Sequence, residues 1–135
     1  MTIKKIIDKL LPQLSVLVAI GIGVFLLFFV ITCTWIGFEV KSECKHAQDK
    51  YDGDCVGALI ELLDNENEGF KDRNTAIWAL GEMGDARALP VLEKYYTGDI
   101  PEREPLNKVI SQYELKKALN LARGGTNLTA IFWRY

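Results

Sequence analysis

The sequence is poor in the residues from which enzymes and metal sites are commonly built. Its 135 residues include one histidine and three cysteines. It has no C-x-x-C pair, no glycine-rich phosphate loop after a predicted strand, and no nucleophile with a suggested base nearby. These absences argue against haem attachment, phosphate binding and nucleophilic catalysis. We therefore expect no catalytic residue, no cofactor-binding residue and no metal ligand, and a protein that is not an enzyme.

Charged residues are absent from one long stretch and dense in the rest of the chain. Between Leu10 and Phe38 there is no Asp, Glu, Lys or Arg. From Glu39 to Tyr135 there are 13 Lys and Arg against 17 Asp and Glu, a formal net charge of −4. An acidic domain disfavours nucleic acid as a partner, because binding of phosphates needs a basic face. The composition thus divides the chain into a membrane-like part and a water-soluble part.

Residues 14–38 are predicted to form a transmembrane helix. This run of apolar residues is longer than the roughly 20 residues that a helix needs to cross the hydrocarbon core. The rival interpretation is a cleaved signal peptide, whose apolar region is about half as long and ends in small residues. Here the run ends in Cys33-Thr-Trp-Ile-Gly-Phe38, which is a poor cleavage site. We expect residues 1–13 to be a short head and residues 14–38 to contact the lipid bilayer.

The orientation of this helix in the membrane is only weakly encoded. Three lysines lie on each side of the apolar run, so the positive-inside rule gives a nearly balanced count. They are Lys4, Lys5 and Lys9 before the run, and Lys41, Lys45 and Lys50 after it. A short head followed by a long folded region inserts most simply with the head in the cytoplasm. We therefore expect a single-pass membrane protein with an extracytoplasmic, periplasmic domain.

Residues 39–53 are predicted to form a polar stalk and a turn. Cys44 and Cys55 flank the turn signal Tyr51-Asp-Gly-Asp54. Outside the cytoplasm they can form a disulfide, which would stabilise the fold by roughly 2–3 kcal/mol. The alternative is a free Cys44 and a buried Cys55. A metal site that also uses His46 lacks a fourth ligand, so we expect His46 to be a solvated stalk residue.

Residues 54–125 are predicted to be an all-α domain. The apolar periodicity predicts helices over 55–63, 70–83, 85–96 and 106–123. A shift of 30 residues places Ala58-Leu59-x-x-Leu62 on Ala88-Leu89-x-x-Leu92, and each motif follows a Gly-Asp corner. A helical pair that repeats at this period is typical of a solenoid. Only residues 126–135 alternate in the manner of a strand.

One stretch of the domain carries a family resemblance. Residues 73–92 read R-N-T-A-I-W-A-L-G-E-M-G-D-A-R-A-L-P-V-L. This resembles the HEAT-like repeats of the phycocyanobilin-lyase type, which have an Arg followed by A-x-x-A-L-G-x-x-G-D-x-R-A-L-P-x-L. The resemblance implies a short α-solenoid of two to three helical pairs, a fold usually used to bind other proteins. The family name comes from enzymes that attach bilins to phycobiliproteins, but the repeat itself carries no catalytic set. The chain departs from the family in its few repeats and its membrane helix.

Candidate interface residues surround this motif. Trp78 either points outward as an interface anchor or packs against the preceding helix or stalk. Arg73 and Arg87 match the basic positions of the motif and are expected to bind Asp85 or carbonyls at helix ends. Of Tyr95 and Tyr96, one is expected to pack and the other to face water. The full candidate set is Trp78, Arg87, Tyr95, Tyr96, Phe132, Trp133 and Tyr135.

Residues 126–135 form a short aromatic tail with two possible roles. The tail either caps the last helix of the domain, or it acts as a docking peptide or an element at the membrane interface. Trp and Tyr side chains are favoured at that interface, which gives the second role a physical basis.

The sequence as a whole predicts a membrane-anchored HEAT-like protein–protein interaction module. It would act as a scaffold or as a small subunit of a membrane protein complex, with protein partners at or in the membrane. The alternative is an accessory, lyase-like protein that handles a chromophore- or cofactor-bearing partner. That function needs a ligand groove and a bilin-handling residue, and the sequence identifies neither. A third possibility is oligomerisation through the membrane helix.

Overall fold

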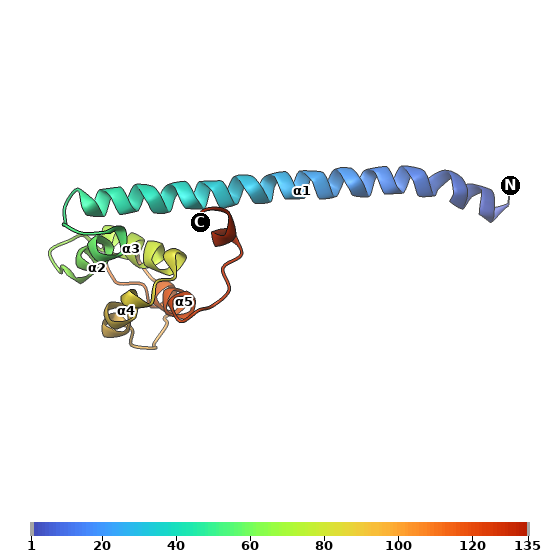
Figure 1. Cartoon of the computed structure of the whole chain (residues 1–135). Coiled ribbons are helices and arrows are strands. Elements are labelled where there is room, and N and C mark those ends of the chain that lie inside the picture. The colour runs from blue at the N-terminus through green and yellow to red at the C-terminus, as the bar shows by residue number, and fades with distance from the viewer. Residues whose placement is uncertain (1, 135) are drawn as a thin grey trace.

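The computed structural model describes residues 2–134 and confirms that they are all-α. They form five α-helices and two short 3-10 helices, with no strand among the described residues. The elements are α1 (Ile3–Gln48), α2 (Cys55–Asp64), α3 (Phe70–Met83), η1 (Ala86–Ala88), α4 (Leu89–Tyr95), α5 (Gln112–Ala122) and η2 (Thr129–Phe132). Figure 1 shows α1 as a long rod, with the other helices gathered along its C-terminal part.

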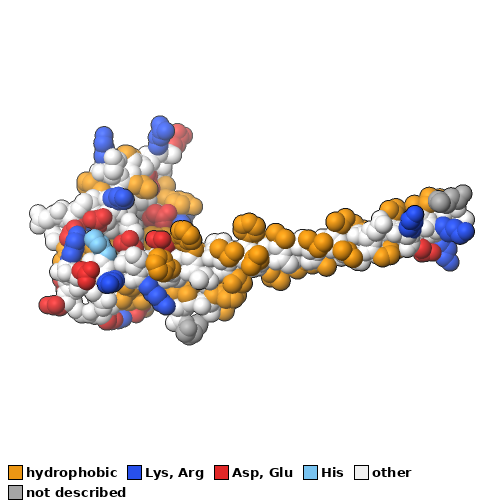
Figure 2. Space-filling model, turned by 90° about the horizontal axis from the view of Figure 1, so that it is seen from above, with side chains coloured by type: hydrophobic (Ala, Val, Ile, Leu, Met, Phe, Trp, Pro, Cys, Tyr) orange, Lys and Arg blue, Asp and Glu red, His pale blue; other side chains and the backbone are white. Residues whose placement is uncertain are grey.

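Helix α1 is long and apolar enough to cross a membrane by length and composition. Its 46 residues correspond to about 69 Å at 1.5 Å per residue. It runs through the predicted head and apolar segment and most of the predicted stalk. In its most apolar window of 18 residues, no side chain is buried by the rest of the protein. Figure 2 shows apolar side chains along this exposed rod, with basic side chains at its free end.

The C-terminal end of α1 packs against the domain, although the sequence predicted a polar stalk there. Two of its residues are buried, and Cys44 packs against the core. The stripe on this face of α1 comprises Cys33, Gly37, Val40, Cys44 and Ala47. Its members are alternately four and three residues apart, which is the spacing of one helix face. Through this face α1 contacts α2 and α3. The end of α1 therefore forms a helical pair with α2, and α3 and α4 follow as the next pair.

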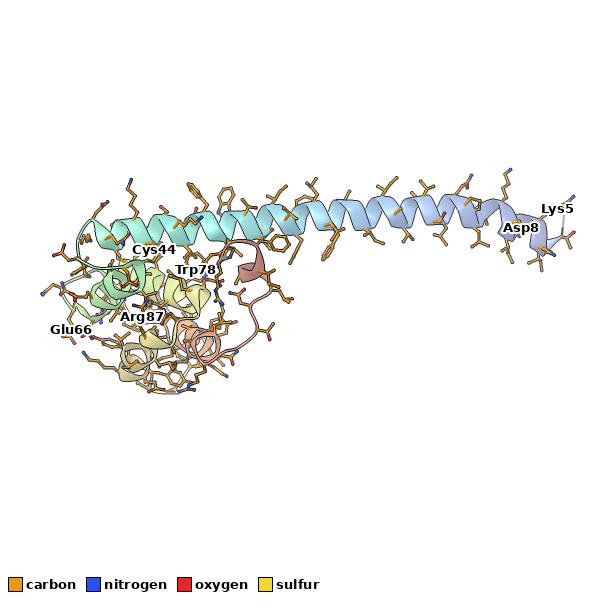
Figure 3. The ribbon with its side chains drawn as sticks, viewed as in Figure 1. Lys5, Asp8, Cys44, Glu66, Trp78 and Arg87 are labelled. Atoms are coloured by element: carbon orange, nitrogen blue, oxygen red, sulfur yellow. A yellow bond between two sulfur atoms is a disulfide. The ribbon has the colours of Figure 1, made fainter. Side chains whose placement is uncertain are left out.

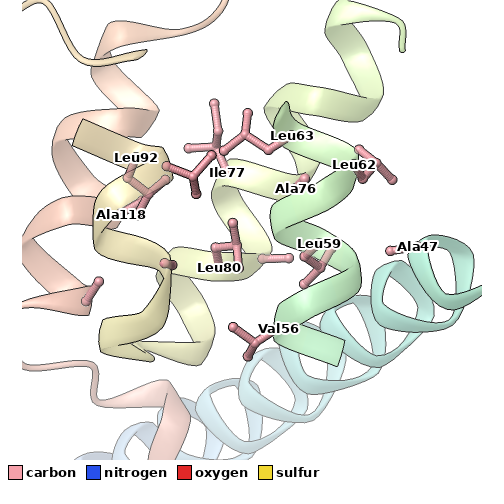
Figure 4. Packing of buried hydrophobic residues seen from close by; sticks show 14 of the residues in the cluster. Ala47, Val56, Leu59, Leu62, Leu63, Ala76, Ile77, Leu80, Leu92 and Ala118 are labelled. Carbon is pink, nitrogen blue, oxygen red and sulfur yellow. The ribbon is translucent and has the colours of Figure 1, made fainter. Parts of the chain in front are cut away.

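The core lies between α1 and the four shorter helices. Helix α3 is central, because it packs against α1, α2 and α5. Figure 4 shows how leucine side chains from α2, α3 and α4 meet in this core, with Ala47 of α1 at its edge. The largest fully buried side chains there include Leu59, Leu62, Leu63, Ile77, Leu80 and Leu92. The apolar positions Ala58, Leu59 and Leu62 of the repeated motif are thus among those that the fold buries.

The corner between α3 and α4 is built by local sequence signals. Gly84 adopts a left-handed conformation with φ 63° and ends α3. The carboxylate of Asp85 then accepts a hydrogen bond from the backbone N–H of Arg87 at 2.9 Å, as an N-cap does. Pro90 lies in the first turn of α4, where its missing N–H costs no hydrogen bond. The predicted helix 85–96 is therefore divided into η1 and α4.

Helix α5 begins later than the sequence predicted. The apolar spacing predicted a helix from Leu106, but α5 begins at Gln112, after Ser111 as its N-cap. The amide of Asn74 donates hydrogen bonds to the carbonyls of Leu106 (2.9 Å) and Val109 (2.8 Å). These bonds hold the preceding segment in turns, so its apolar side chains never join a helical stripe.

The described part of the aromatic tail, residues 126–134, forms no strand and packs on α1 instead of capping the last helix. It contains η2, which packs against α1. A Cβ atom added to Gly37 would lie 2.5 Å from the Cβ of Trp133, so the tail approaches the backbone of α1 closely. The ring of Phe132 meets the ring of Phe29 edge-on, with centroids 5.7 Å apart. The chain therefore returns to the long helix from which the domain began.

Candidate protein-interaction surface

A groove lies on the outer face of α5. Helix α5 buries Leu115, Ala118 and Leu119 against the domain, and its opposite face is exposed. The groove, of about 470 Å³, lies between this face and the end of α4. It is lined by Tyr96, Tyr113, Lys116, Lys117, Leu119, Asn120 and Arg123. Among residues 2–134 no further helix covers this face of α5, which is where the next helix of a longer solenoid would pack.

The groove combines aromatic and cationic side chains. Tyr113 is 55% exposed, and the ammonium group of Lys117 lies 5.4 Å from the centroid of its ring. Lys117 also pairs with Glu114 at 3.3 Å. Arg123 donates to a carboxylate oxygen of Glu93 at 2.8 Å. Tyr and Arg are enriched among the residues that dominate protein interfaces. The groove thus presents the residue types that are common in protein interfaces.

Of the residues that the sequence singled out, Tyr96 is the one that lines this groove. Tyr96 and Tyr95 are both half-buried, so the expected division into one packed and one wet tyrosine is wrong. The hydroxyl of Tyr95 donates to a carboxylate oxygen of Asp64 at 3.0 Å. The guanidinium group of Arg73 lies 5.0 Å from the centroid of the Tyr95 ring. Tyr95 thus serves the packing between helices.

Trp78 is half-buried and packs against the hydrophobic core. Figure 3 shows it on α3, within the body of the domain. Of the two orientations considered for Trp78, the structure shows the packed one. Arg73 is buried, and its Nε donates to the carbonyl of Leu63 in the last turn of α2 at 2.8 Å. This is the helix-end carbonyl contact expected of the basic motif positions.

Arg87 ties together the two Gly-Asp corners of the repeat. Its Nη2 donates to Asp54 at 2.8 Å, and its Nε donates to both carboxylate oxygens of Asp85 at 3.1 and 3.2 Å. Asp54 and Asp85 are the N-caps of α2 and η1. Hydrogen bonds from Arg87 are the main cause that lowers the pKa of each carboxyl, and backbone N–H groups lower it further. Arg87 is thus exposed but already has partners within the domain.

Two further candidates lie away from the groove, because Phe132 and Trp133 pack on α1. Tyr135 lies outside the described residues. The six described candidates therefore occupy several parts of the molecule and do not form one surface.

The two cysteines that flank the predicted turn lie together. Cys44 on α1 and Cys55 at the start of α2 are joined as a disulfide, with Cα atoms 4.9 Å apart. The thioether of Met83 lies 3.2 Å from the sulfur of Cys55. His46 is exposed on α1. Within residues 2–134 no three His, Cys, Asp or Glu side chains are grouped so as to hold a metal ion.

Sequence reasoning missed most of the groove. Tyr113, Lys116, Lys117 and Arg123 are not among the candidate residues that the sequence indicated. One signal was available, because Tyr113, Lys116, Asn120 and Arg123 follow one another at intervals of three and four residues on one helix face. An aromatic residue within such a polar stripe indicates an exposed binding face.

Two comparisons with known proteins give a match. One match covers the corner between α3 and α4, and the other covers 41 residues of the chain. Residues 72–97, which include most of α3, η1 and α4, match the family model of the PBS lyase HEAT-like repeat. The chain is also 46% identical over 41 residues to deoxyhypusine hydroxylase from Candida albicans (strain SC5314 / ATCC MYA-2876). That alignment covers 30% of this chain and 13% of the relative, so the chain spans a small part of the relative's length. No solved structure gives a significant match.

Both names belong to enzymes or enzyme-related repeats, but the matches reach only a short segment of the chain. The family-model match at residues 72–97 includes the packed corner with Gly84, Asp85 and Arg87. The match supports a HEAT-like repeat at residues 72–97, which are similar to the PBS lyase type.

Proposed function

We propose that this protein is a single-pass membrane protein whose HEAT-like domain binds another protein at the membrane, as a scaffold or as a small subunit of a membrane complex. The observation that carries this proposal is the continuity of α1. One helix holds both the exposed apolar run and the first packed helix of the domain. A partner bound by the domain would therefore be held at a fixed distance from the bilayer.

The polar groups of α1 support a place in lipid. Within the apolar run every hydroxyl group donates to a backbone carbonyl of the same helix. Ser15 donates to Pro12 at 2.8 Å, Thr32 to Phe28 at 2.9 Å and Thr34 to Val30 at 2.8 Å. A bilayer supplies no water to satisfy such groups, so internal bonds of this kind suit a spanning helix. In water the same exposed run would far exceed the apolar patches that soluble monomers tolerate.

The pairing of the two cysteines supports the proposal of an extracytoplasmic domain. Disulfides persist in oxidising compartments and are rare in the cytosol. Cys44 and Cys55 lie on the domain side of the apolar run, so a disulfide between them favours a domain outside the cytoplasm.

The open face of α5 supports a protein partner. HEAT-like repeats are helical repeats of a kind that mediates protein–protein interactions, and the groove offers exposed aromatic and cationic side chains. Anchoring raises the local concentration of the domain near partners in the same membrane, so a modest interface suffices. We propose that this binding, and not catalysis, is the task of the domain. Absorption bands from a pigment that co-purifies with the intact protein would instead favour the chromophore-handling alternative.

Site-specific photo-crosslinking in native membranes tests the proposed interface. A photoreactive amino acid is placed at Tyr113 or Lys116 in the groove, and at Glu66 in the exposed loop between α2 and α3 as the control (Figure 3). We expect one discrete adduct from the groove positions and none from Glu66. The double substitution Lys116→Glu, Lys117→Glu should remove the adduct made from Tyr113. Identical adducts from all three positions would contradict a binding site on α5.

A further inference from the structure

We propose that residues 127–134, here called the return segment, are a second membrane-contacting element, seated in the interfacial layer of the bilayer beside α1. The inference rests on the proposed membrane span of α1. It adds that the domain is attached to the membrane at two places along its chain, which fixes how the domain faces the lipid.

The position of the return segment along α1 is the first support. Trp133 packs over Gly37, and Phe132 packs against Phe29. Both contacts lie within the uncharged run that ends at Phe38. The predicted span 14–38 has about five residues more than the roughly 20 needed for the hydrocarbon core. With the extra residues shared between the two ends, Gly37 lies near the level of the lipid headgroups, and Phe29 lies about 12 Å deeper along α1. The return segment would thus extend from the headgroup level toward the acyl chains.

The composition of the return segment matches that level of the bilayer. No charged residue occurs between Arg123 and Arg134. Its large apolar side chains are exposed, since Leu128 is 62%, Ile131 64% and Phe132 52% accessible. On the other side of α1, roughly 200° around the helix from Cys33, Trp35 is 67% exposed. The exposed Trp35 and the half-buried Trp133 thus lie at a similar level along α1, and aromatic side chains at one level are typical of a membrane interface.

Several backbone N–H groups of the return segment are hydrogen-bonded within the segment, without water. The side-chain oxygen of Asn127 accepts from the backbone N–H groups of Thr129 (3.1 Å) and Ala130 (3.3 Å), and from the Thr129 hydroxyl (2.7 Å). The carbonyl of Ala130 accepts from the N–H groups of Trp133 and Arg134. Lipid tolerates irregular backbone only where such groups are satisfied internally.

The return segment is also fastened to the domain. The amide of Asn127 donates to a carboxylate oxygen of Glu82 at 2.6 Å, and the guanidinium group of Arg134 donates to the backbone carbonyl of the same Glu82. Glu82 lies in the last turn of α3. The segment thus bridges the end of α3 to α1 near the end of the apolar run. A bilayer around α1 would meet the segment at this bridge and hold α3 at a fixed angle to the membrane.

Tryptophan fluorescence in lipid vesicles tests the inference with the full chain. The three tryptophans, Trp35, Trp78 and Trp133, each report on a different part of the molecule. Three variants keep one tryptophan each and carry phenylalanine at the other two positions. Each is reconstituted into phosphatidylcholine vesicles, with or without bromine at carbons near the headgroup end of the acyl chains. We expect brominated lipid to lower the emission of Trp35 and Trp133, and to leave the emission of Trp78 unchanged.

Quenching of Trp35 without quenching of Trp133 would overturn the inference and leave the anchor standing. No quenching of Trp35 would overturn both the anchor and the inference. Equal quenching of Trp78 and Trp133 would also overturn the inference, because contact with lipid would not be specific to the return segment.

Substitution of a glycine in α1 supplies a second, independent readout. In the Trp133 variant, Gly37→Leu places a side chain where Trp133 lies, while Gly23→Leu meets no atom within 4 Å. We expect Gly37→Leu to change the quenching of Trp133 and to speed proteolysis of the return segment in vesicles. Gly23→Leu should change neither. Equal behaviour of the two variants would contradict the docking of the return segment on α1.

Discussion

At the scale of single residues, Gly81 decides how closely α3 approaches α5. A Cβ atom at this position would lie 2.8 Å from the Cα of Ala118, which is backbone and cannot move aside cheaply. We expect Gly81→Val to lower the free energy of unfolding of the domain by about 1–3 kcal/mol, as overpacking commonly does. Urea denaturation followed by circular dichroism measures the change. The control is Gly21→Val in α1, where nothing lies within 4 Å of the added carbon. Equal stability of the two variants would contradict close packing at Gly81.

The ion pairs of Arg87 make the stability of the domain depend on pH. Arg87 lowers the pKa of Asp54 and Asp85 below the ordinary value, which is about 3.9 for aspartate. A carboxyl with a lowered pKa in the folded state contributes stability that is present above the ordinary pKa and is lost as the pH falls through the folded value. We therefore expect the urea midpoint to fall progressively from about pH 4 downward.

Asparagine substitutions isolate the charges behind this pH dependence. Asn is as good an N-cap as Asp, so Asp54→Asn with Asp85→Asn removes the two charges and keeps the caps. The double variant should lose less stability than the wild type between pH 5 and pH 3. Asp52→Asn, at an exposed position next to the corner, is the matched control and should behave like the wild type. An unchanged pH dependence in the double variant would contradict the role of Arg87.

At the scale of elements, the disulfide joins the end of α1 to the start of α2. Closing a loop of this length should stabilise the domain by roughly 2–3 kcal/mol in the chain-entropy model. We expect a reductant to lower the urea midpoint of the wild type to that of the double variant Cys44→Ser, Cys55→Ser. The same reductant should leave the double variant unchanged, because its remaining Cys33 has no bonded partner among the described residues. An unchanged urea midpoint of the wild type in the presence of the reductant would contradict a stabilising disulfide.

Local signals account for the elements that the sequence predicted well. The bounds of α3 follow from its apolar periodicity and from Gly84, which can adopt the left-handed conformation that ends a helix. The start of α5 was misplaced because Leu106 and Val109 have helical spacing, while their carbonyls bind Asn74, 32 and 35 residues away in sequence. A hydrogen bond to a side chain far away in sequence can prevent a helix despite helical spacing, and the local sequence does not indicate it.

At the scale of the whole molecule, the parts that sequence reasoning missed depend on contacts between distant segments. The groove on α5 needs Tyr96 from the end of α4, and the return segment needs Gly37 from α1. Residues 39–48 were read as a stalk because they are polar on average. Their buried positions, Val40 and Ala47, continue a stripe that begins inside the apolar run. The buried residues lie on both sides of Phe38, where the apolar run ends. Their common helical spacing is therefore missed when the apolar run and the polar segment are analysed separately.

The continuity of α1 from lipid into the domain is tested most directly by a spin-label scan of residues 14–48 in lipid nanodiscs. The measured quantity at each position is the accessibility of the label to oxygen, which enriches in lipid, and to a water-soluble nickel complex. We expect high oxygen accessibility up to about Phe38 and water accessibility beyond it, on one unbroken period of about 3.6 residues. Labels at Cys33, Val40 and Ala47 should be protected from both reagents. Water accessibility along the whole run, or a break in the period near residues 39–41, would contradict a membrane helix that continues as the first helix of the domain.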